Sequence, residues 1–343
     1  MTTERLTTEL EDILKAGEII RRGGLVAFPT ETVYGLGANA LDAEAVRSVY
    51  AAKGRPSDNP MIVHISELPE LEPLIRGGLA GLSDDARKIM DSFWPGPLTI
   101  VLPKADAVPD ATTGGLDTVA VRMPSNRTAY MLIAASLRPV AAPSANLSGR
   151  PSPTTAEDVL EDMDGRIDAV IMGEQCDVGI ESTVLDLTGE VPTILRPGII
   201  TKEQLTEVLG REAVYYKGLL EKPAETADPE DGVADTEFRP KSPGMKYRHY
   251  SPKAKVRLIE GNAEEFAAIS RKLGLEAMEN GLRPAVLDYE DDQLAAAHDL
   301  FADLREFDRE GYDIIFIRTL EQSGLGFSVM NRMLKSAGYD IVK

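Results

Sequence analysis

Two short polar segments of the sequence carry side chains that suit phosphate chemistry. In KGRPSDNP at 53–60, Lys53 and Arg55 are two residues apart, and such side chains project to the same side of an extended chain. An ammonium and a guanidinium that converge on one point would form a clamp for phosphate, with bidentate contact from the arginine. An ordinary solvated loop is the alternative, but the acidic character of the protein, the intervening glycine and the prolines that follow favour the clamp.

The segment PSANLSGRPSPTT at 143–155 places small hydroxyl and amide groups after an apolar, strand-like run. Ser144 and Asn146 have the same two-residue spacing, and α/β proteins bind ligands at the carboxyl ends of their strands. Taken alone, the segment could also be a turn-rich connection. Its hydroxyl groups can contact phosphate oxygens without adding charge, and they belong to Ser144, Ser148, Ser152, Thr154 and Thr155.

Two arginines and one histidine lie in or beside apolar runs. Arg122 falls within TVAVRM, where an unpaired guanidinium would be costly, so it pairs either with a substrate carboxylate or with an acidic side chain of the protein. Arg196 in ILRPG presents the same choice. His64 within MIVHI is more typical of a hydrogen-bonded core histidine than of a ligand or base. A zinc site is not indicated, because no nearby His, Cys or acidic residue has the spacing of a metal ligand.

The segment PTETVYGLG at 29–37 follows an apolar run, and its glycines permit close approach of the backbone. It could form the lip of a small-molecule site. On its own it favours a strand-to-helix turn that needs glycine. It lacks the Gly-Lys-Ser/Thr ending of a Walker loop, and it is not a Rossmann fingerprint.

The elements that would position these residues alternate between strands and helices. Asp42 can cap a helix that delivers Lys53 to the point where Gly54 breaks the pattern. Helical stretches fall between several of the strands, so the predicted class is α/β. The expected buried strands lie at 25–28, 61–65, 98–102, 118–123, 139–142, 168–172 and 182–187.

The character of the sequence changes after residue 216. Seven carboxylates and two basic side chains lie between Gly218 and Pro240, which is typical of a solvated linker. A basic, tyrosine-containing stretch follows, and from Val256 strand-like segments again alternate with helical ones. We therefore expect a first domain at 1–216, a linker at 217–254 and a small α/β domain at 255–343.

Composition limits the classes of function. Among 343 residues, 56 are acidic and 37 basic, and the net charge of −19 disfavours nonspecific nucleic-acid binding. Any anionic ligand therefore needs a local basic pocket. The single cysteine, Cys176, excludes an internal disulfide and a cysteine-cluster zinc site. Because no signal peptide and no apolar run of about 20 residues is evident, we expect a cytoplasmic protein without a membrane segment.

The motifs PTETVYGLG, KGRPSDNP, WPGPLT, VAVRMP and PSANLSG, in this order, resemble those of the YrdC-like domain. With STVLD, ILRPG, SPGMKYRHYSP and GLGFSVMNRMLKSA downstream, the chain resembles two-domain threonylcarbamoyl-AMP synthases nearly from end to end. The resemblance implies a twisted open YrdC-like sheet with helices, a lid-like linker and a small Rossmann-like α/β domain.

The same resemblance implies a nucleotidyltransferase that forms L-threonylcarbamoyladenylate from L-threonine, bicarbonate and ATP. Pyrophosphate is released, and Mg²⁺ accompanies the ATP. The product would supply the threonylcarbamoyl group for modification of tRNA. A partner enzyme would transfer this group, so contact with tRNA is expected to be indirect.

Site residues also follow from the resemblance, position by position. The family's catalytic, phosphate-handling tetrad corresponds to Lys53, Arg55, Ser144 and Asn146. Its threonine contacts correspond to Thr32, His64, Arg122, Ala142 and Ser182. Its ATP contacts correspond to Arg55, Asn59, Thr118, Ser144, Ser152, Arg196 and Tyr247, the last on the segment expected to fold over the nucleotide. No residue is assigned as a metal ligand.

Two other functions are compatible with a YrdC-like domain. The first is a carbamoyltransferase, because hydrogenase-maturation proteins contain a similar domain. Those proteins add cysteine-rich zinc fingers, which one cysteine cannot supply. The second is an RNA-binding module with a basic concave surface, which the strongly negative net charge disfavours.

Overall fold

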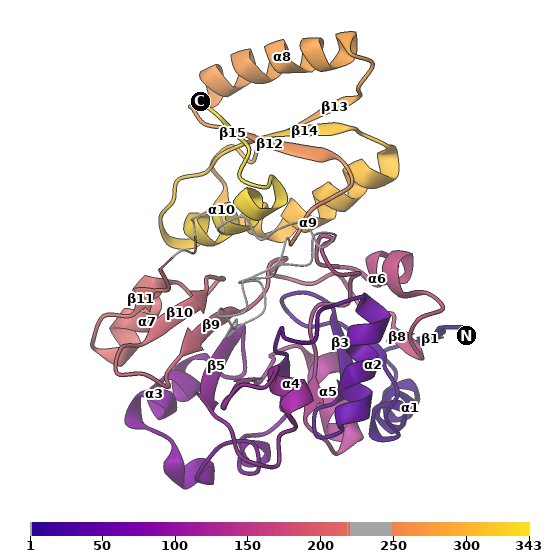
Figure 1. Cartoon of the computed structure of the whole chain (residues 1–343), viewed down its shortest axis with the longest axis vertical. Coiled ribbons are helices and arrows are strands. Elements are labelled where there is room, and N and C mark those ends of the chain that lie inside the picture. The colour runs from indigo at the N-terminus through magenta and orange to yellow at the C-terminus, as the bar shows by residue number, and fades with distance from the viewer. Residues whose placement is uncertain (1, 218, 220–248) are drawn as a thin grey trace.

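The computed structural model of the chain describes residues 2–217, 219 and 249–343, which fold into two α/β bodies (Figure 1). The larger body contains an eleven-stranded sheet and the smaller a four-stranded sheet. Figure 1 shows the C-terminal body stacked on one side of the larger body, with α9 (Gln293–Glu310) and α10 (Gly324–Ser336) at the junction. The expected α/β class is confirmed. The domain boundaries at 216 and 254 stay predictions, because most of the expected linker lies outside the described residues.

The large sheet is mixed, with the strand order β1-β8-β2-β3-β7-β4-β6-β5-β9-β10-β11. Each strand expected in this part of the sequence forms in it. The bounds are Glu4–Leu6 (β1), Val26–Phe28 (β2), Gly35–Asn39 (β3), Ile62–His64 (β4), Leu98–Pro103 (β5), Thr118–Arg122 (β6), Val140–Ala141 (β7), Ala169–Ile171 (β8), Thr183–Asp186 (β9), Thr193–Arg196 (β10) and Val214–Tyr215 (β11).

Helices connect these strands, and the one that carries Lys53 has the expected ends. The side chain of Asp42 accepts hydrogen bonds from the backbone N–H groups of Glu44 and Ala45, and Gly54 ends the helix at φ 60°. The helices are Leu10–Arg21 (α1), Ala43–Lys53 (α2), Asp84–Phe93 (α3), Asp110–Thr113 (α4), Arg127–Ser136 (α5), Ala156–Met163 (α6) and Lys202–Leu209 (α7), with 3-10 turns at Leu68–Leu71 and Gly78–Gly81.

Strand register brings chemically active side chains to one edge of the large sheet. Parallel strands β4 and β6 both end at this edge, and their register pairs His64 with Arg122. The antiparallel strand β5 pairs Thr99 with Arg122. Strand β9 runs parallel to β5, and Ser182 directly precedes it at the same edge. Residues 64, 99, 122 and 182 therefore meet although they are far apart in sequence.

The segment PTETVYGLG does not lead into a helix. Strands β2 and β3 form an antiparallel pair in which Val26 lies opposite Gly37. A Cβ atom on Gly37 would lie 2.9 Å from the side chains of Phe28 and Val140, so this glycine allows close packing within the sheet. The expectation of a strand-to-helix turn is wrong, because the local pattern does not reveal how tightly neighbouring strands pack.

The C-terminal body is a parallel sheet with helices on both faces. Its strand order is β13-β14-β12-β15, and the alternation along β14 sends Ile314 and Phe316 toward α8 and Ile315 and Ile317 toward α9 and α10. The bounds are Lys255–Ile259 (β12), Ala263–Glu279 (α8), Pro284–Leu287 (β13), Ile314–Arg318 (β14) and Ile341–Val342 (β15). In the described part of the chain, no helix has the length and apolar character needed to cross a bilayer.

Candidate active site

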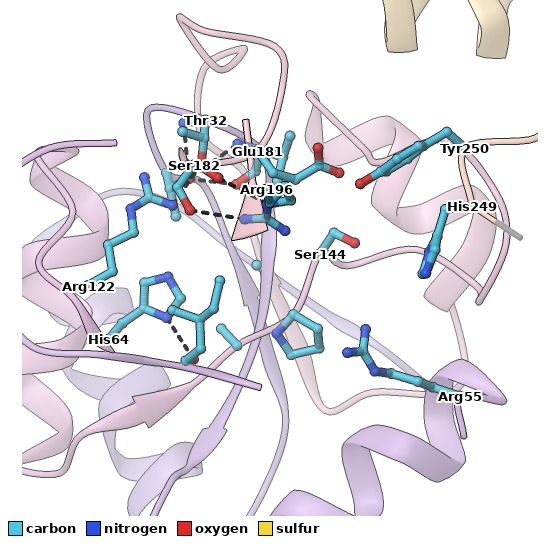
Figure 2. Close-up of a pocket in the computed structure, with 16 residues that line it drawn as sticks. Thr32, Arg55, His64, Arg122, Ser144, Glu181, Ser182, Arg196, His249 and Tyr250 are labelled. Carbon is cyan, nitrogen blue, oxygen red and sulfur yellow. Dashed lines mark hydrogen bonds between the residues drawn. The ribbon is translucent and has the colours of Figure 1, made fainter. Parts of the chain in front are cut away.

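A pocket at this sheet edge brings together eight of the residues assigned from the sequence. Figure 2 shows Arg122 and His64 on one side, Arg55 on the other, and Ser182 and Arg196 between them. The eight residues that line the pocket are Thr32, Arg55, His64, Arg122, Ala142, Ser144, Ser182 and Arg196. Three guanidinium groups in one small pocket give it the local positive charge that an anionic ligand of an acidic protein requires.

Arg122 is held in place by groups of the protein. Its Nη2 lies 2.7 Å from the carboxylate of Glu31, its Nη1 donates to Thr32 Oγ1 at 2.9 Å, and its Nε donates to the carbonyl of Gly96. Burial opposes ionisation of Glu31, but the charge of Arg122 keeps the pKa of that carboxyl below its usual value. Arg122 therefore has an acidic partner within the chain, while its contact with a substrate carboxylate stays a prediction.

His64 is a buried, neutral, hydrogen-bonded histidine at the wall of the pocket. Its Nδ1 donates to the carbonyl of Ile62, which also accepts from the backbone N–H of Ala142. Burial, followed by the charge of Arg122, lowers the pKa of His64 to about 3. The imidazole therefore does not act as a cation at neutral pH.

Ser182 and Arg196 form the central wall. Arg196 donates from Nε to the Ser182 carbonyl and from Nη2 to Ser182 Oγ, each at 3.0 Å. Ser182 Oγ also lies 2.8 Å from Thr99 Oγ1. Because one hydroxyl joins these groups, the position of Arg196 is coupled to that of Ser182.

Lys53 does not project beside Arg55 as the extended geometry predicted. Lys53 ends helix α2 and Gly54 takes a left-handed conformation, so the chain from Lys53 to Arg55 is not extended. The Lys53 ammonium, 2% exposed, donates to the backbone carbonyls of Ser144 and Asn146. Its pKa lies well below the usual value, first because of burial and then because of Arg55. Lys53 thus fixes the 144–146 loop.

Arg55 reaches the pocket from a loop that it also stabilises. Its Nη2 donates to the carbonyls of Asn59 and Pro60, and burial lowers its pKa to about 10, so it stays charged at neutral pH. The side chain of Ser144 donates to Asn146 Oδ1, which places both residues beside the Lys53 ammonium.

Five of the assigned residues do not line the pocket in this state. Lys53 donates to the backbone of the 144–146 loop, and Asn146 belongs to that loop and accepts from Ser144. Asn59 is buried beside Arg55, and Thr118 lies at the start of β6, the end of the strand remote from Arg122. Ser152 is buried and donates to Glu181 at 2.6 Å. A further assigned residue, Tyr247, lies outside the described residues.

Three ionisable residues of the pocket escaped the sequence assignment. Glu181, His249 and Tyr250 line the pocket, and Figure 2 shows Tyr250 directed toward Glu181 and His249 standing beside Arg55. Burial, followed by the charge of Glu181, raises the pKa of Tyr250 to about 12. The aromatic and basic stretch at 246–250 was the feature of the sequence that could have indicated His249 and Tyr250. For Glu181, the only such feature was that it directly precedes Ser182.

The pocket is nearly filled by the protein itself. Its free volume is about 50 Å³, whereas pockets for small-molecule ligands usually measure about 300–1,000 Å³. His249 stands among the positive charges of Lys335, Arg55, Lys53 and Arg196, and after burial these charges keep its pKa well below the usual value. Residues 249–250 therefore occupy space in which an anionic ligand would be electrostatically favoured.

Comparison with known proteins agrees with this architecture. A family model described as Telomere recombination matches residues 18–198, and one described as Threonylcarbamoyl-AMP synthase, C-terminal domain, matches residues 200–338. The threonylcarbamoyl-AMP synthase of Pyrococcus abyssi is 45% identical over 339 residues, which cover 96% of this chain and 94% of that protein. The chain belongs to the threonylcarbamoyl-AMP synthase family. The Bacillus subtilis member is 42% identical over 355 residues, covering 99% and 97% of the two chains.

Solved structures of this family share the fold of both bodies. Sua5 of Pyrococcus abyssi, complexed with L-threonine, superimposes with a TM-score of 0.89 at 42% identity, over 100% of this chain and 99% of that one. A doubly substituted variant of the same protein gives a TM-score of 0.90 at 43% identity, over 99% and 98%. The resemblance inferred from the motifs and the expected two-body α/β fold are confirmed.

Proposed function

We propose that the chain forms L-threonylcarbamoyladenylate from L-threonine, bicarbonate and ATP and releases pyrophosphate. Membership of the threonylcarbamoyl-AMP synthase family supports this activity. The structural observation that carries it is the convergence of Arg55, Arg122 and Arg196 on one pocket with His64 and Ser182. These groups match a substrate set that contains one carboxylate and several phosphates.

The reaction needs positioning rather than a nucleophilic side chain. The amine of threonine and bicarbonate first give a carbamate with loss of water. A carbamate oxygen then attacks the α-phosphorus of ATP, the new P–O bond forms, and the bond to the β-phosphate oxygen breaks to release pyrophosphate. The thiol of Cys176 is buried, and burial raises its pKa to about 12, so it is not a nucleophile for this step. Held geometry and neutralised charge supply the catalysis.

We assign the threonine half of the pocket to the side that holds Arg122 and His64. Arg122, fixed by Glu31 and Thr32, would bind the threonine carboxylate through its remaining donors. His64 would contact the substrate as a neutral imidazole, in keeping with its lowered pKa. Ala142 and Ser182 would complete this half.

We assign the ATP half to the opposite side, around Arg55 and Arg196. Lys53 and Asn146 would support it from behind by holding the Ser144 loop. Asn59, Thr118 and Ser152 would join the nucleotide contacts. Residues 249–250, and Tyr247 beyond them, would move to admit ATP and then close over it, because the free volume of about 50 Å³ does not hold a nucleotide.

Other components follow from the chemistry. Mg²⁺ would enter as part of the MgATP substrate, bound by phosphate oxygens. The mixed anhydride product is reactive toward amines and water, so a partner enzyme that binds tRNA would take the threonylcarbamoyl group from it. These steps belong to the cytoplasm, where ATP and tRNA are available.

The direct test uses purified full-length protein with MgATP, bicarbonate and L-threonine. We expect threonine-dependent release of pyrophosphate and formation of threonylcarbamoyladenylate, detected by mass spectrometry. A second reaction replaces threonine and bicarbonate with carbamoyl phosphate. Pyrophosphate release only in the second reaction would support a carbamoyltransferase instead, and no threonine dependence in folded protein would overturn the proposal.

A further inference from the structure

One helix of the C-terminal body, α10, contacts the wall of the pocket. Ser328 Oγ donates to the carbonyl of Gly198 at 2.8 Å, and Arg332 Nη1 donates to the carbonyl of Pro197. Ser328 and Arg332 are four residues apart, so they lie on the same face of the helix. Both bind the turn that immediately follows Arg196. The C-terminal body thus fixes the backbone that carries a predicted nucleotide contact.

Arg332 also reaches a carboxylate that lines the pocket. Its Nε lies 3.2 Å from Glu181 Oε2, while Glu181 Oε1 accepts a hydrogen bond from Ser152 Oγ at 2.6 Å. Arg332 is 0% exposed and Glu181 6%. Although burial opposes ionisation of Glu181, Arg332 and then Arg196 keep the pKa of that carboxyl below its usual value. A buried charge of this kind is held only where its partner is present.

Glu181 therefore joins the two bodies at a point between predicted substrate contacts. It precedes Ser182, which binds Arg196, and it accepts from Ser152. Without Arg332, the Glu181 carboxylate would be buried close to the nucleotide phosphates with its main counter-charge removed. It would then repel those phosphates or draw Arg196 away from them.

We propose that Arg332 is a positioning residue for the ATP half of the pocket, so that the C-terminal body completes the active site. It holds the Glu181 carboxylate and the Pro197–Gly198 turn, and through them it sets Ser152 and Arg196. This role rests on the proposed adenylate-forming function, because it presumes a nucleotide on that side.

Arg309 provides a comparison on the neighbouring helix α9, at a position where its side chain is 39% exposed and that of Arg332 is 0% exposed. It also crosses between the bodies, with its Nη1 2.9 Å from Asp158 and 3.0 Å from Glu161 on α6. Neither acidic residue lines the pocket. An Arg309 substitution therefore removes ion pairs between the two bodies without touching the Glu181 carboxylate.

The test compares the full-length variants Arg332→Gln, Arg332→Lys, Glu181→Gln and Arg309→Gln with the unsubstituted protein. ATP affinity is measured by calorimetry, KM for ATP and for threonine by pyrophosphate release, and Tm by differential scanning fluorimetry. We expect Arg332→Gln to weaken ATP binding and to raise KM for ATP about tenfold or more, where each factor of ten equals about 1.4 kcal/mol. The KM for threonine should change less.

The conservative and control variants separate positioning from general stabilisation. Arg332→Lys keeps the charge but not the forked geometry, so we expect partial recovery of ATP affinity. Glu181→Gln removes the carboxylate but keeps an acceptor for Ser152, so it should weaken ATP binding less than Arg332→Gln does. Arg309→Gln should lower Tm with little change in either KM. If Arg332→Gln does not fold, Arg332→Lys decides the matter in the same way.

Two results would overturn the role of Arg332. One is that the folded Arg332 variants bind ATP with the same affinity as the unsubstituted protein and differ from it only in a reduced Tm. The other is an equal loss of ATP affinity in Arg309→Gln. Failure of the unsubstituted protein to release threonine-dependent pyrophosphate would contradict the proposed function separately, and the calorimetric comparison would still decide whether Arg332 positions a nucleotide site.

Discussion

The carboxylate of Glu31 lies 2.7 Å from Nη2 of Arg122, and these two side chains are 7% and 4% exposed. Each charge offsets the cost of burying the other, since an isolated ion in this position would be strongly unfavourable. The pair also places the Arg122 guanidinium beside Thr32 before any ligand arrives. A pre-formed guanidinium loses little conformational freedom when it binds a carboxylate.

Replacement of Glu31 by alanine tests this pair. Because Arg122 would be left buried without its counter-charge, the free energy of unfolding should fall by about 3–5 kcal/mol, and KM for threonine should rise. Urea unfolding and pyrophosphate-release kinetics measure the two effects. Glu207→Ala, at an exposed position of α7, is the control and should change neither. Unchanged stability in Glu31→Ala would show that Arg122 does not depend on this carboxylate.

Lys53 and Arg55 should differ in the balance between stability and binding. Lys53→Met removes the donor for two loop carbonyls, so the free energy of unfolding should fall by roughly 1–3 kcal/mol for each carbonyl left without a partner, and activity should be lost. Arg55→Ala should abolish ATP binding with a smaller loss of stability. Urea unfolding and calorimetric ATP titration distinguish them. Lys53→Met with undiminished stability would argue that Lys53 acts on the ligand directly.

His64 should make the protein sensitive to acid. Its folded-state pKa of about 3 lies below the ordinary value of 6.5, so between these limits the unfolded chain binds a proton that the folded chain does not. The contribution of His64 to the free energy of unfolding is fully present above pH 6.5. It is lost as the pH falls toward 3, by at most about 1.4 kcal/mol per pH unit. His64→Gln should therefore lose less stability than the unsubstituted protein between pH 7.5 and 4.5. Parallel curves of unfolding free energy against pH would contradict the assigned burial of a neutral histidine.

Removal of residues 218–343 should impair turnover more than it impairs folding of the first body. Turnover should be lost because Glu181 loses Arg332 and the proposed lid residues 249–250 are absent. Some stability should also be lost, because Asp162 on α6 loses the buried guanidinium of Arg305, 2.9 Å away. Circular dichroism, thermal unfolding and pyrophosphate release provide the comparison. Unchanged turnover in the truncated chain would refute both the lid and the role of the C-terminal body.

Local sequence was sufficient for many of the elements and for part of the pocket. The strand containing His64 and the strand containing Arg122 were both expected from their apolar runs. Asp42 and Gly54 marked the two ends of helix α2, which precedes both strands in the chain. These features depend on neighbouring residues, through side-chain alternation, capping and turn conformation. The motifs then identified which polar residues belong together, including Ser182 and Arg196.

The sequence by itself thus determined the α/β class, the family and eight of the residues that line the pocket. Only the tertiary structure decided how those residues are held. In the folded chain, Arg122 pairs with Glu31, and the Lys53 ammonium donates hydrogen bonds to the 144–146 loop. Glu181 contacts Arg332, which lies 151 positions later in the sequence. Buried charges and carbonyls are satisfied by whichever partner the folded chain brings near, and no periodicity along the sequence encodes a partner that is distant in the chain.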